Sequence, residues 1–158
     1  LYNSSSGVSD WIVEKITKSI SLYSNTPHVS IRLINNADQK TMFVKADGNE
    51  LLRTFNNLIK NAIEGGYGRK NKKIEIAIER YSDKFVKIDV KDNGYGIPDG
   101  MKDKIFQINF TTKSSGNGLG LVLVKRTIEA SNGQIYFETV EGEGTIFHIL
   151  LPLEQIES

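Results

Sequence analysis

The sequence predicts a single domain in which α-helices and β-strands are combined. Its 158 residues fit one domain, and a chain of this length buries roughly 68–70% of its unfolded surface, which is enough for one hydrophobic core. Apolar residues recur at helical spacing in three stretches and alternate with polar residues in six others. Glycine, proline and asparagine separate these stretches, as expected for turns.

The composition excludes several kinds of protein. Lys plus Arg number 20 and Asp plus Glu 19, so the formal net charge of +1 gives no reason to expect nucleic acid or an anionic membrane as a partner. The absence of cysteine excludes disulfides and thiolate metal sites. No apolar run approaches the ~20 residues of a membrane span, and no signal peptide is visible. Residues 1–7 resemble a linker or a cut end, so we expect the folded domain over residues 8–153 and a tail over 154–158.

The first part of the chain predicts a helix followed by two strands. Ile12, Ile16 and Ile20 recur at helical spacing over residues 9–24. We interpret this stripe as core packing rather than as a partner-binding face. The alternation that follows predicts a strand over residues 29–33 and a second strand over 41–45. Residues 35–38 are predicted to form the turn between them.

A second helix is predicted to begin at Asp47 and to run to about Ile63. Asp47 can accept hydrogen bonds from first-turn amides while Glu50 reaches back, which makes a capping box. Asn57 and Asn61 stack on one face of this helix about 6 Å apart, although asparagine is a poor helix former. They form either a solvated face or a pair of amide oxygens turned toward a cation or a phosphate. Mg²⁺ prefers such oxygen ligands.

Glycines at residues 65–68 end this helix, and a basic cluster at residues 69–73 follows. We interpret the cluster as solvated, with a phosphate contact from Arg69 or Lys70 as the less favoured alternative. Alternating isoleucines and valines then predict a hairpin of two strands, at 74–78 and 85–91.

The second strand of the hairpin ends at a carboxylate, Asp92. Gly94 and Gly96 follow it and allow the backbone to take positive φ and to approach a ligand closely. A carboxylate acceptor beside bare backbone can recognise a base edge that carries an amino group, such as adenine. Taken alone, Asn93-Gly94 fits an ordinary hairpin turn better.

Residues 99–117 show little periodicity apart from a short helix predicted at 101–106. A long irregular segment inside a compact domain is typical of function. Hydroxyls and an amine that can meet phosphate lie in it, at Thr111, Thr112 and Lys113. The segment therefore has what a lid over a bound nucleotide needs.

A glycine-rich run opens a third helix, predicted over residues 121–131. The run contains Gly116, Gly118, Leu119 and Gly120. Amides at a helix N-terminus can hold a phosphate. The spacing is not that of a P-loop, and the position does not fit a Rossmann site. Two strands complete the chain, at 135–139 and 145–151, and Pro152 is expected to stop the second.

Five motifs, in this order along the chain, resemble the ATP-binding domain of bacterial sensor histidine kinases. They are the residues 57–64, 92–98, 106–113, 116–121 and 142–145. Each motif is weak alone, but the ordered set is strong, and the resemblance covers about residues 8–152. The resemblance extends to the superfamily that includes DNA gyrase, heat-shock chaperone ATPases and mismatch-repair ATPases. It implies an α/β (α+β) two-layer sandwich of the Bergerat type, in which a mixed, mostly antiparallel sheet packs on helices and a lid covers ATP.

The resemblance also implies roles for the site residues. Asn61 resembles the asparagine that binds Mg²⁺, and Asp92 resembles the aspartate that binds adenine. The base pocket corresponds to Gly94, Gly96, Ile97 and Thr145. The phosphate-covering lid corresponds to Thr111, Thr112, Lys113, Gly116, Gly118, Leu119 and Gly120. Residues expected to act in catalysis are Asn57, Asn61 and Lys113.

Asn57 stands where the hydrolysing branches of the superfamily place glutamate. Water needs a general base to attack phosphorus, whereas a neutral imidazole already offers a lone pair near pH 7. We therefore predict a protein-histidine kinase catalytic domain that acts by positioning and charge stabilisation. It would transfer the γ-phosphate of Mg-ATP to a histidine on a missing dimerisation domain, with negligible ATP hydrolysis on its own.

Two departures from the family pattern leave an alternative open. Residues 107–109 replace the usual Glu-Pro-Phe, and Glu64-Gly65 replaces Lys-Tyr, as in the nitrogen-regulation branch. The altered lid supports a non-catalytic nucleotide-sensing module of the same fold. A protein-serine kinase of the anti-sigma type is disfavoured, because a serine acceptor needs a base. We interpret His28 and His148 as structural, since neither lies in a helix followed by an acidic residue.

The expected partners follow from the same resemblance. They are ATP, the phosphoacceptor domain of the same protein or of its dimer mate, and a downstream response regulator. The resemblance implies a cytoplasmic domain with no direct membrane contact, and it leaves open a parent protein anchored in the bacterial inner membrane.

Overall fold

The computed structural model of the chain describes residues 8–37, 43–44, 46–107 and 120–154. Within these residues the elements in chain order are α1 (Val8–Tyr23), β1 (Val29–Asn36), β2 (Phe43–Val44), α2 (Gly48–Gly65), β3 (Lys72–Arg80), β4 (Phe85–Asp92), the 3₁₀-helix η1 (Asp99–Lys104), α3 (Gly120–Ala130), β5 (Gln134–Val140) and β6 (Gly144–Glu154).

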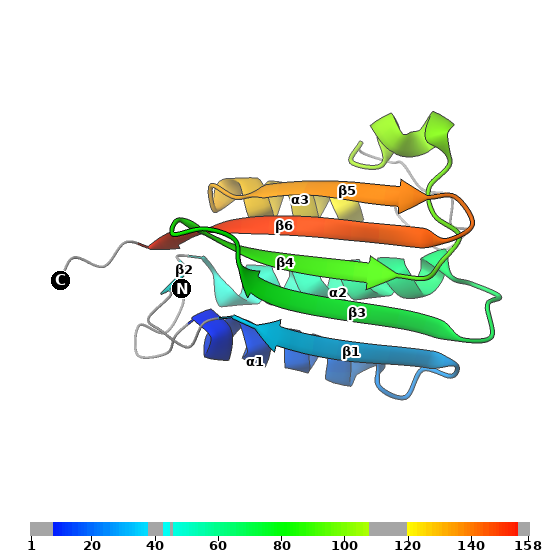
Figure 1. Ribbon diagram of the computed structural model, residues 1–158, viewed down its shortest axis with the longest axis horizontal. Helices are drawn as coiled ribbons and strands as arrows, with labels where there is room; N and C mark the ends of the chain where they lie inside the picture. Colours follow the sequence, from blue (N-terminus) through cyan, green and yellow to red (C-terminus); the bar gives the residue numbers. More distant parts are fainter. Residues whose placement is uncertain (1–7, 38–42, 45, 108–119, 155–158) are drawn as a thin grey trace.

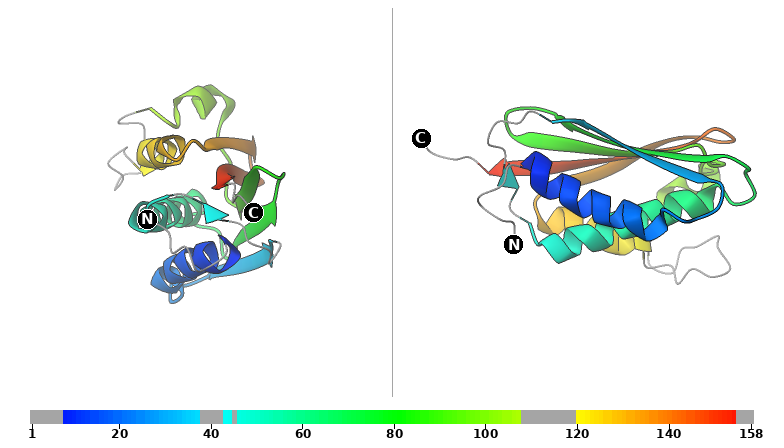
Figure 2. Two further views of the ribbon diagram at one scale, coloured as in Figure 1. Left: turned by 90° about the vertical axis from the view of Figure 1, so that its left-hand side faces the viewer. Right: turned by 90° about the horizontal axis from the view of Figure 1, so that it is seen from below.

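The elements form two layers (Figure 1). The strands make one mixed sheet in the order β1-β3-β4-β6, and β5 and β2 both pair with the other edge of β6. β1 runs parallel to β3, and the remaining pairs are antiparallel. The three α-helices cover one face of the sheet, with α2 between α1 and α3 (Figure 2). This arrangement confirms the predicted sandwich.

The hydrophobic core fills the space between the two layers. Alternate residues of the three central strands point at the helices and are buried, namely Ile74, Ile76, Ile78, Val86, Ile88, Val90, Phe147, Ile149 and Leu151. The matching face of α2 supplies Leu51, Phe55, Leu58, Ile59 and Ala62. Burying one such large side chain fully stabilises the fold by about 1.5–3 kcal/mol. The apolar stripe that predicts α2 is thus also the surface that fixes this helix on the sheet.

The start of α2 differs in one contact from the predicted capping box. Asp47 Oδ1 accepts hydrogen bonds from the Asn49 and Glu50 amides at 2.8 and 3.2 Å, as expected. The Glu50 carboxylate, however, does not turn back toward Asp47. Its Oε1 lies 3.2 Å from Arg53 Nη1, and its Oε2 accepts from the Thr127 hydroxyl of α3 at 3.5 Å. The Glu50 carboxylate therefore links α2 to α3 instead of closing the predicted capping box.

Three other predicted boundaries were wrong. β1 continues through Asn35 and Asn36, where a turn was predicted, because these residues pair with β3. β6 runs past Pro152 to Glu154, since the amide of Leu153 resumes bonding with the Lys84 carbonyl at 2.7 Å. The helix predicted at 101–106 is the 3₁₀-helix η1, which begins two residues earlier.

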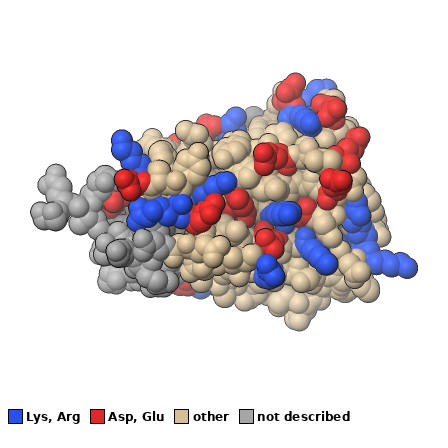
Figure 3. Space-filling model, in the orientation of Figure 1, with Lys and Arg blue, Asp and Glu red and all other residues tan. Residues whose placement is uncertain are grey.

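The outer face of the sheet is not covered by the helices and carries interspersed charges (Figure 3). Arg32 and Glu75 pair across β1 and β3 at 3.3 Å. His148 is buried on this face, with its ring nitrogens 2.7 Å from Asp89 Oδ1 and 2.9 Å from Glu138 Oε2. None of the helices within the ranges given above has the length and apolar character needed to cross a membrane.

Candidate functional site

The candidate site lies where β4 ends. Asp92 is half-buried there, and the strand register places it beside Ile74 of β3 and Thr145 of β6. The Gly94 amide donates a hydrogen bond to Asp92 Oδ1 at 2.9 Å. This contact between residues two apart is an Asx-type turn, and it helps to orient the carboxylate.

Asn93 fixes the backbone next to Asp92 to the neighbouring strand. The Lys73 amide donates to Asn93 Oδ1 at 2.8 Å, and Asn93 Nδ2 donates to the Asn71 carbonyl at 2.9 Å. The Asn93 amide also donates to the Lys73 carbonyl at 3.2 Å. The side chain thereby extends the β3–β4 ladder by one step, so the Asn-Gly pair is not the tip of a hairpin.

Two glycines let other backbone segments approach the loop that follows. A Cβ on Gly94 would lie 2.6 Å from the Gly65 carbonyl oxygen, at the end of α2. Gly96 has φ +76°, and a Cβ there would lie 2.5 Å from the Val140 carbonyl oxygen. Both distances are too short for any side chain. The glycines are therefore required for close packing around Asp92, in agreement with the bare backbone predicted there.

Thr139 of β5 is a site residue that sequence reasoning missed. Its Oγ1 accepts from the Ile97 amide at 2.9 Å, and it lies 2.9 Å from Thr145 Oγ1 and 3.1 Å from the Gly144 carbonyl. It thus ties the loop after β4 to the start of β6. Its position in the strand could have identified it. Thr139 is a polar residue in the inward-facing stripe that Ile135 and Phe137 begin.

Asn57 and Asn61 lie outside the stripe of α2 that is buried against the sheet, on the side of the helix where Glu50 contacts α3. Asn57 and Asn61 are 40° apart around a helix with 100° per residue, and both are half-buried. Glu64 lies on the same face and pairs with Lys60 at 3.9 Å. One turn after Asn61, the Gly65 carbonyl accepts from the Tyr95 amide at 3.0 Å. The structure therefore brings the asparagine face and the Asp92 loop to the same end of the molecule.

Most of the predicted lid lies outside the described residues. This applies to Thr111, Thr112, Lys113, Gly116, Gly118 and Leu119, so their predicted roles stay predictions. Gly120 is the first residue of α3, and a Cβ there would meet nothing within 4 Å. Phe106, just before the segment, packs edge-on against Phe137 and Phe147.

Arg69 is not solvated as predicted. Its Nη2 donates to the Gly142 carbonyl at 2.6 Å and lies 3.4 Å from the Gly94 carbonyl. Its guanidinium carbon lies 4.4 Å from the centre of the Tyr95 ring. Lys70 and Lys73 are exposed, as expected. The interpretation failed for Arg69 because both carbonyls come from distant parts of the sequence.

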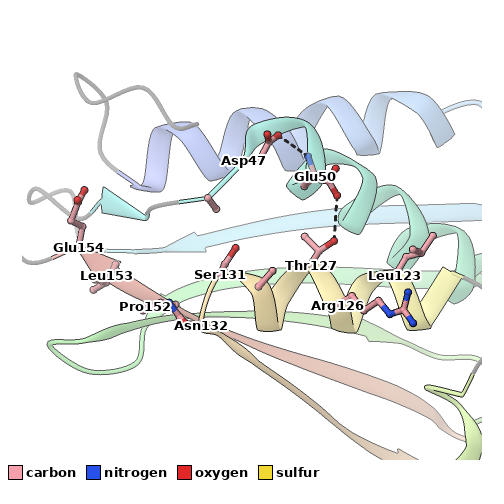
Figure 4. A pocket seen from close by; sticks show the side chains of 12 residues that line it. Asp47, Glu50, Leu123, Arg126, Thr127, Ser131, Asn132, Pro152, Leu153 and Glu154 are labelled. Carbon is pink, nitrogen blue, oxygen red and sulfur yellow. Dashed lines mark hydrogen bonds between the residues drawn. The ribbon is translucent and has the colours of Figure 1, made fainter.

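A groove of about 750 Å³ lies at the opposite end of α2 (Figure 4). It is lined by Asp47 and Glu50 of the helix start, by Leu123, Arg126 and Thr127 of α3, and by the end of β6. Asp47 is about 21 Å along the axis from Asn61, at 1.5 Å per residue. The groove is therefore separate from the site at Asp92.

Known proteins are similar to this chain in both sequence and fold. The family model described as histidine kinase-, DNA gyrase B- and HSP90-like ATPases matches residues 46–155. The sensor protein kinase WalK of Staphylococcus aureus is 38% identical over 133 residues, which cover 78% of this chain and 31% of WalK. In the strain JH9 sequence the same match covers 21% of WalK. The chain thus spans about a fifth to a third of the length of the curated relatives that it matches.

Solved structures agree with the family. The catalytic domain of the histidine kinase ThkA is 31% identical with a TM-score of 0.75, and the match covers 88% of this chain and 90% of that domain. The mycobacterial sensor histidine kinase MprB has a TM-score of 0.78 at 21% identity, covering 92% and 96%. Full-length ShkA in complex with AMPPNP has a TM-score of 0.76 at 19% identity, covering 96% and 31%. The last two support the fold alone. The chain therefore belongs to the histidine kinase-, DNA gyrase B- and HSP90-like ATPases, and within them it is the ATP-binding catalytic domain of a sensor histidine kinase.

Proposed function

We propose that this domain binds Mg-ATP between Asp92 and Asn61 and transfers the γ-phosphate to a histidine on a separate domain. The acceptor domain would belong to the same protein or to its dimer mate, and a response regulator would take the phosphate next. The observation that carries the proposal is the oriented Asp92 carboxylate, which the Gly94 amide holds beside the end of α2.

Adenine recognition follows from the chemistry of that carboxylate. An ionised carboxylate only accepts hydrogen bonds, so it selects a base edge that presents an amino group. The glycines at 94 and 96 let the Gly65 and Val140 carbonyls pack closely against the loop that follows this carboxylate. The Thr145 hydroxyl, which contacts Thr139, lies on the neighbouring strand and can complete the polar edge of the pocket.

The asparagine side chains of α2 fit a magnesium ion. The Asn61 amide supplies an oxygen, the ligand type that Mg²⁺ prefers. Among the described residues, no three His, Asp or Glu side chains gather closely enough to hold a metal by themselves. The ion would therefore take its other ligands from phosphates and water, and it would neutralise charge on the transferred phosphoryl group. Lys113 and the residues 116–120 would close over the phosphates.

Asn57 makes the domain a poor hydrolase. An amide cannot take a proton from water, so phosphorus is attacked only when a better nucleophile is positioned by another domain. We expect negligible ATP turnover by the isolated domain. Robust turnover that Asn57→Ala abolishes would show that this assignment is wrong.

Isothermal titration with Mg-ATP tests the site. Asp92→Asn and Asn61→Asp should each weaken binding strongly, the first by presenting a donor to the adenine amino group and the second by altering the metal ligand. Asp103→Asn changes an exposed carboxylate on η1 and is the matched control. Unchanged affinity in both site variants would remove the assignment.

A transfer assay separates the kinase from a module that only senses nucleotide. The chain is incubated with γ-labelled ATP and a separately produced phosphoacceptor domain. Label on the acceptor histidine supports the kinase, whereas ATP binding without transfer to several acceptors supports the sensing module. The similarity to the catalytic domain of ThkA favours transfer.

A further inference from the structure

Three segments that are far apart in the sequence meet at the base-binding end of the site. They are the turn after α2, the loop after β4 and the turn between β5 and β6. The Tyr95 amide donates to the Gly65 carbonyl at 3.0 Å, and the Gly142 amide donates to the Tyr95 carbonyl at 2.7 Å. The walls of the proposed adenine pocket are therefore loops, and these backbone contacts join them.

Arg69 connects all three segments through its side chain. It belongs to the first segment, donates to the Gly142 carbonyl in the third, and contacts Gly94 and Tyr95 in the second. Its own amide donates to the Gly66 carbonyl at 2.9 Å, which fixes the backbone of the turn. A planar guanidinium can donate in two directions while it stacks on an aromatic ring, and a lysine amine cannot.

The Arg69 side chain keeps this position although one of its nitrogen atoms lacks a hydrogen bond. Among the described side chains, Arg69 Nε is a fully buried polar atom without a hydrogen-bond partner. Leaving such a donor unsatisfied is unfavourable, so other contacts must fix the side chain in this place. The charge-assisted bond of 2.6 Å to Gly142 and the stacking on Tyr95 provide these contacts.

We propose that Arg69 is a positioning residue for base recognition, which fixes the loop carrying Gly94 so that Asp92 meets the adenine edge. The proposal rests on the proposed function of Asp92. The Gly94 amide orients the Asp92 carboxylate, and the carbonyl of the same residue faces Arg69. Without the guanidinium, the Gly94 carbonyl loses its contact with Arg69, and the Asp92 carboxylate is then held less firmly. Arg69 acts on the base and makes no contact with phosphate.

The test compares ligands that share the base and differ in phosphate. Adenosine is titrated into the 158-residue chain and followed by NMR, and Mg-ADP and Mg-ATP are titrated by calorimetry. Arg69→Ala should weaken all three by the same factor, about tenfold, which corresponds to the loss of one charge-assisted hydrogen bond. Arg69→Lys keeps the charge and should not restore affinity. Lys70→Ala removes a neighbouring exposed cation and should change nothing.

Each outcome decides the proposal. A folded Arg69→Ala variant with wild-type affinity for adenosine overturns it, and so does a loss confined to the phosphate-bearing ligands. Full restoration by Arg69→Lys also overturns it, because charge alone would then suffice. If Arg69→Ala does not fold, Arg69→Lys must weaken adenosine at least threefold for the proposal to stand. If the wild-type chain binds adenosine and Asp92→Asn does not, the proposed role of Asp92 in adenine binding holds whatever Arg69 does. If neither Mg-ATP nor adenosine binds, both proposals fail together.

Discussion

Gly94→Ala tests how closely the site is packed. The added methyl group would lie 2.6 Å from the Gly65 carbonyl oxygen, 2.8 Å from its carbon and 3.0 Å from Asp92 Oδ1. The first two atoms are backbone at the end of α2 and cannot move aside as a flexible side chain would. The loop must therefore shift, and the bond from the Tyr95 amide to Gly65 is the first to lengthen.

The magnitude follows from these contacts. Forcing a methyl group into a packed site costs about 1–3 kcal/mol, and the lost hydrogen bond adds about 0.5–1.5 kcal/mol. We expect the free energy of unfolding to fall by about 2–4 kcal/mol. With a urea slope of about 2 kcal/mol per M, the unfolding midpoint would fall by about 1–2 M. Affinity for ATP should fall as well, because Asp92 Oδ1 is displaced.

The assay is urea unfolding followed by circular dichroism, together with titration of Mg-ATP at low denaturant. Gly100→Ala is the matched control, since a Cβ there would meet nothing within 4 Å. The control should keep both the midpoint and the affinity of the wild type. A Gly94→Ala variant that matches the control in both measurements would refute the packing described here.

Three further predictions concern single contacts. Thr139→Val leaves the Ile97 amide without its acceptor and should lower the free energy of unfolding, measured in urea, by about 1–3 kcal/mol. Thr139→Ser keeps the hydroxyl and should retain the wild-type stability. Equal stability of the two variants would contradict the role of Oγ1. The Glu50 and Asn49 amides lower the pKa of Asp47 below its ordinary 3.8, so its contribution is complete above that pH and is lost as the pH falls below it. Asp47→Ala should lower the thermal midpoint at pH 7 by about 2–4 °C, and Asp47→Asn should keep most of the midpoint while flattening its acid dependence; an unchanged acid profile would argue against the cap. Burial, and then the charge of Glu64, raise the pKa of Tyr23 above 10.0, so stability should fall as the pH rises beyond 10 and should fall less in Tyr23→Phe, as alkaline unfolding curves would show.

Periodicity was enough to predict the helices and strands of this fold, whereas their arrangement in two layers was implied by the family resemblance. The apolar stripes of α2 and the alternation in β3, β4 and β6 are the core as observed, because burial and period follow from the same geometry. Local chemistry also predicted the Asp47 cap and the place where β4 stops. Asp92 and the bare backbone at Gly94 lie together because they are neighbours in the sequence.

Contacts between distant segments were beyond the reach of sequence reasoning. Thr139 meets Ile97 across 42 residues, and Arg69 meets Gly142 across 73. Nothing in the local pattern distinguishes these two residues from an ordinary strand threonine and a solvated arginine. Glu50 shows the same limit, since the hydroxyl that engages its carboxylate comes from a helix 77 residues away.

The outer face of the sheet has a consequence for where other molecules can approach. Lys87 lies 3.6 Å from Asp89, the same carboxylate faces His148, and Arg32 faces Glu75 on the next pair of strands. Each of these charges already has a neighbour of opposite sign or a hydrogen-bonding ring beside it. A protein that docked on these paired charges would have to desolvate them and would gain few new bonds in return. Docking at these charge pairs is therefore unfavourable unless the partner replaces the bonds that it breaks.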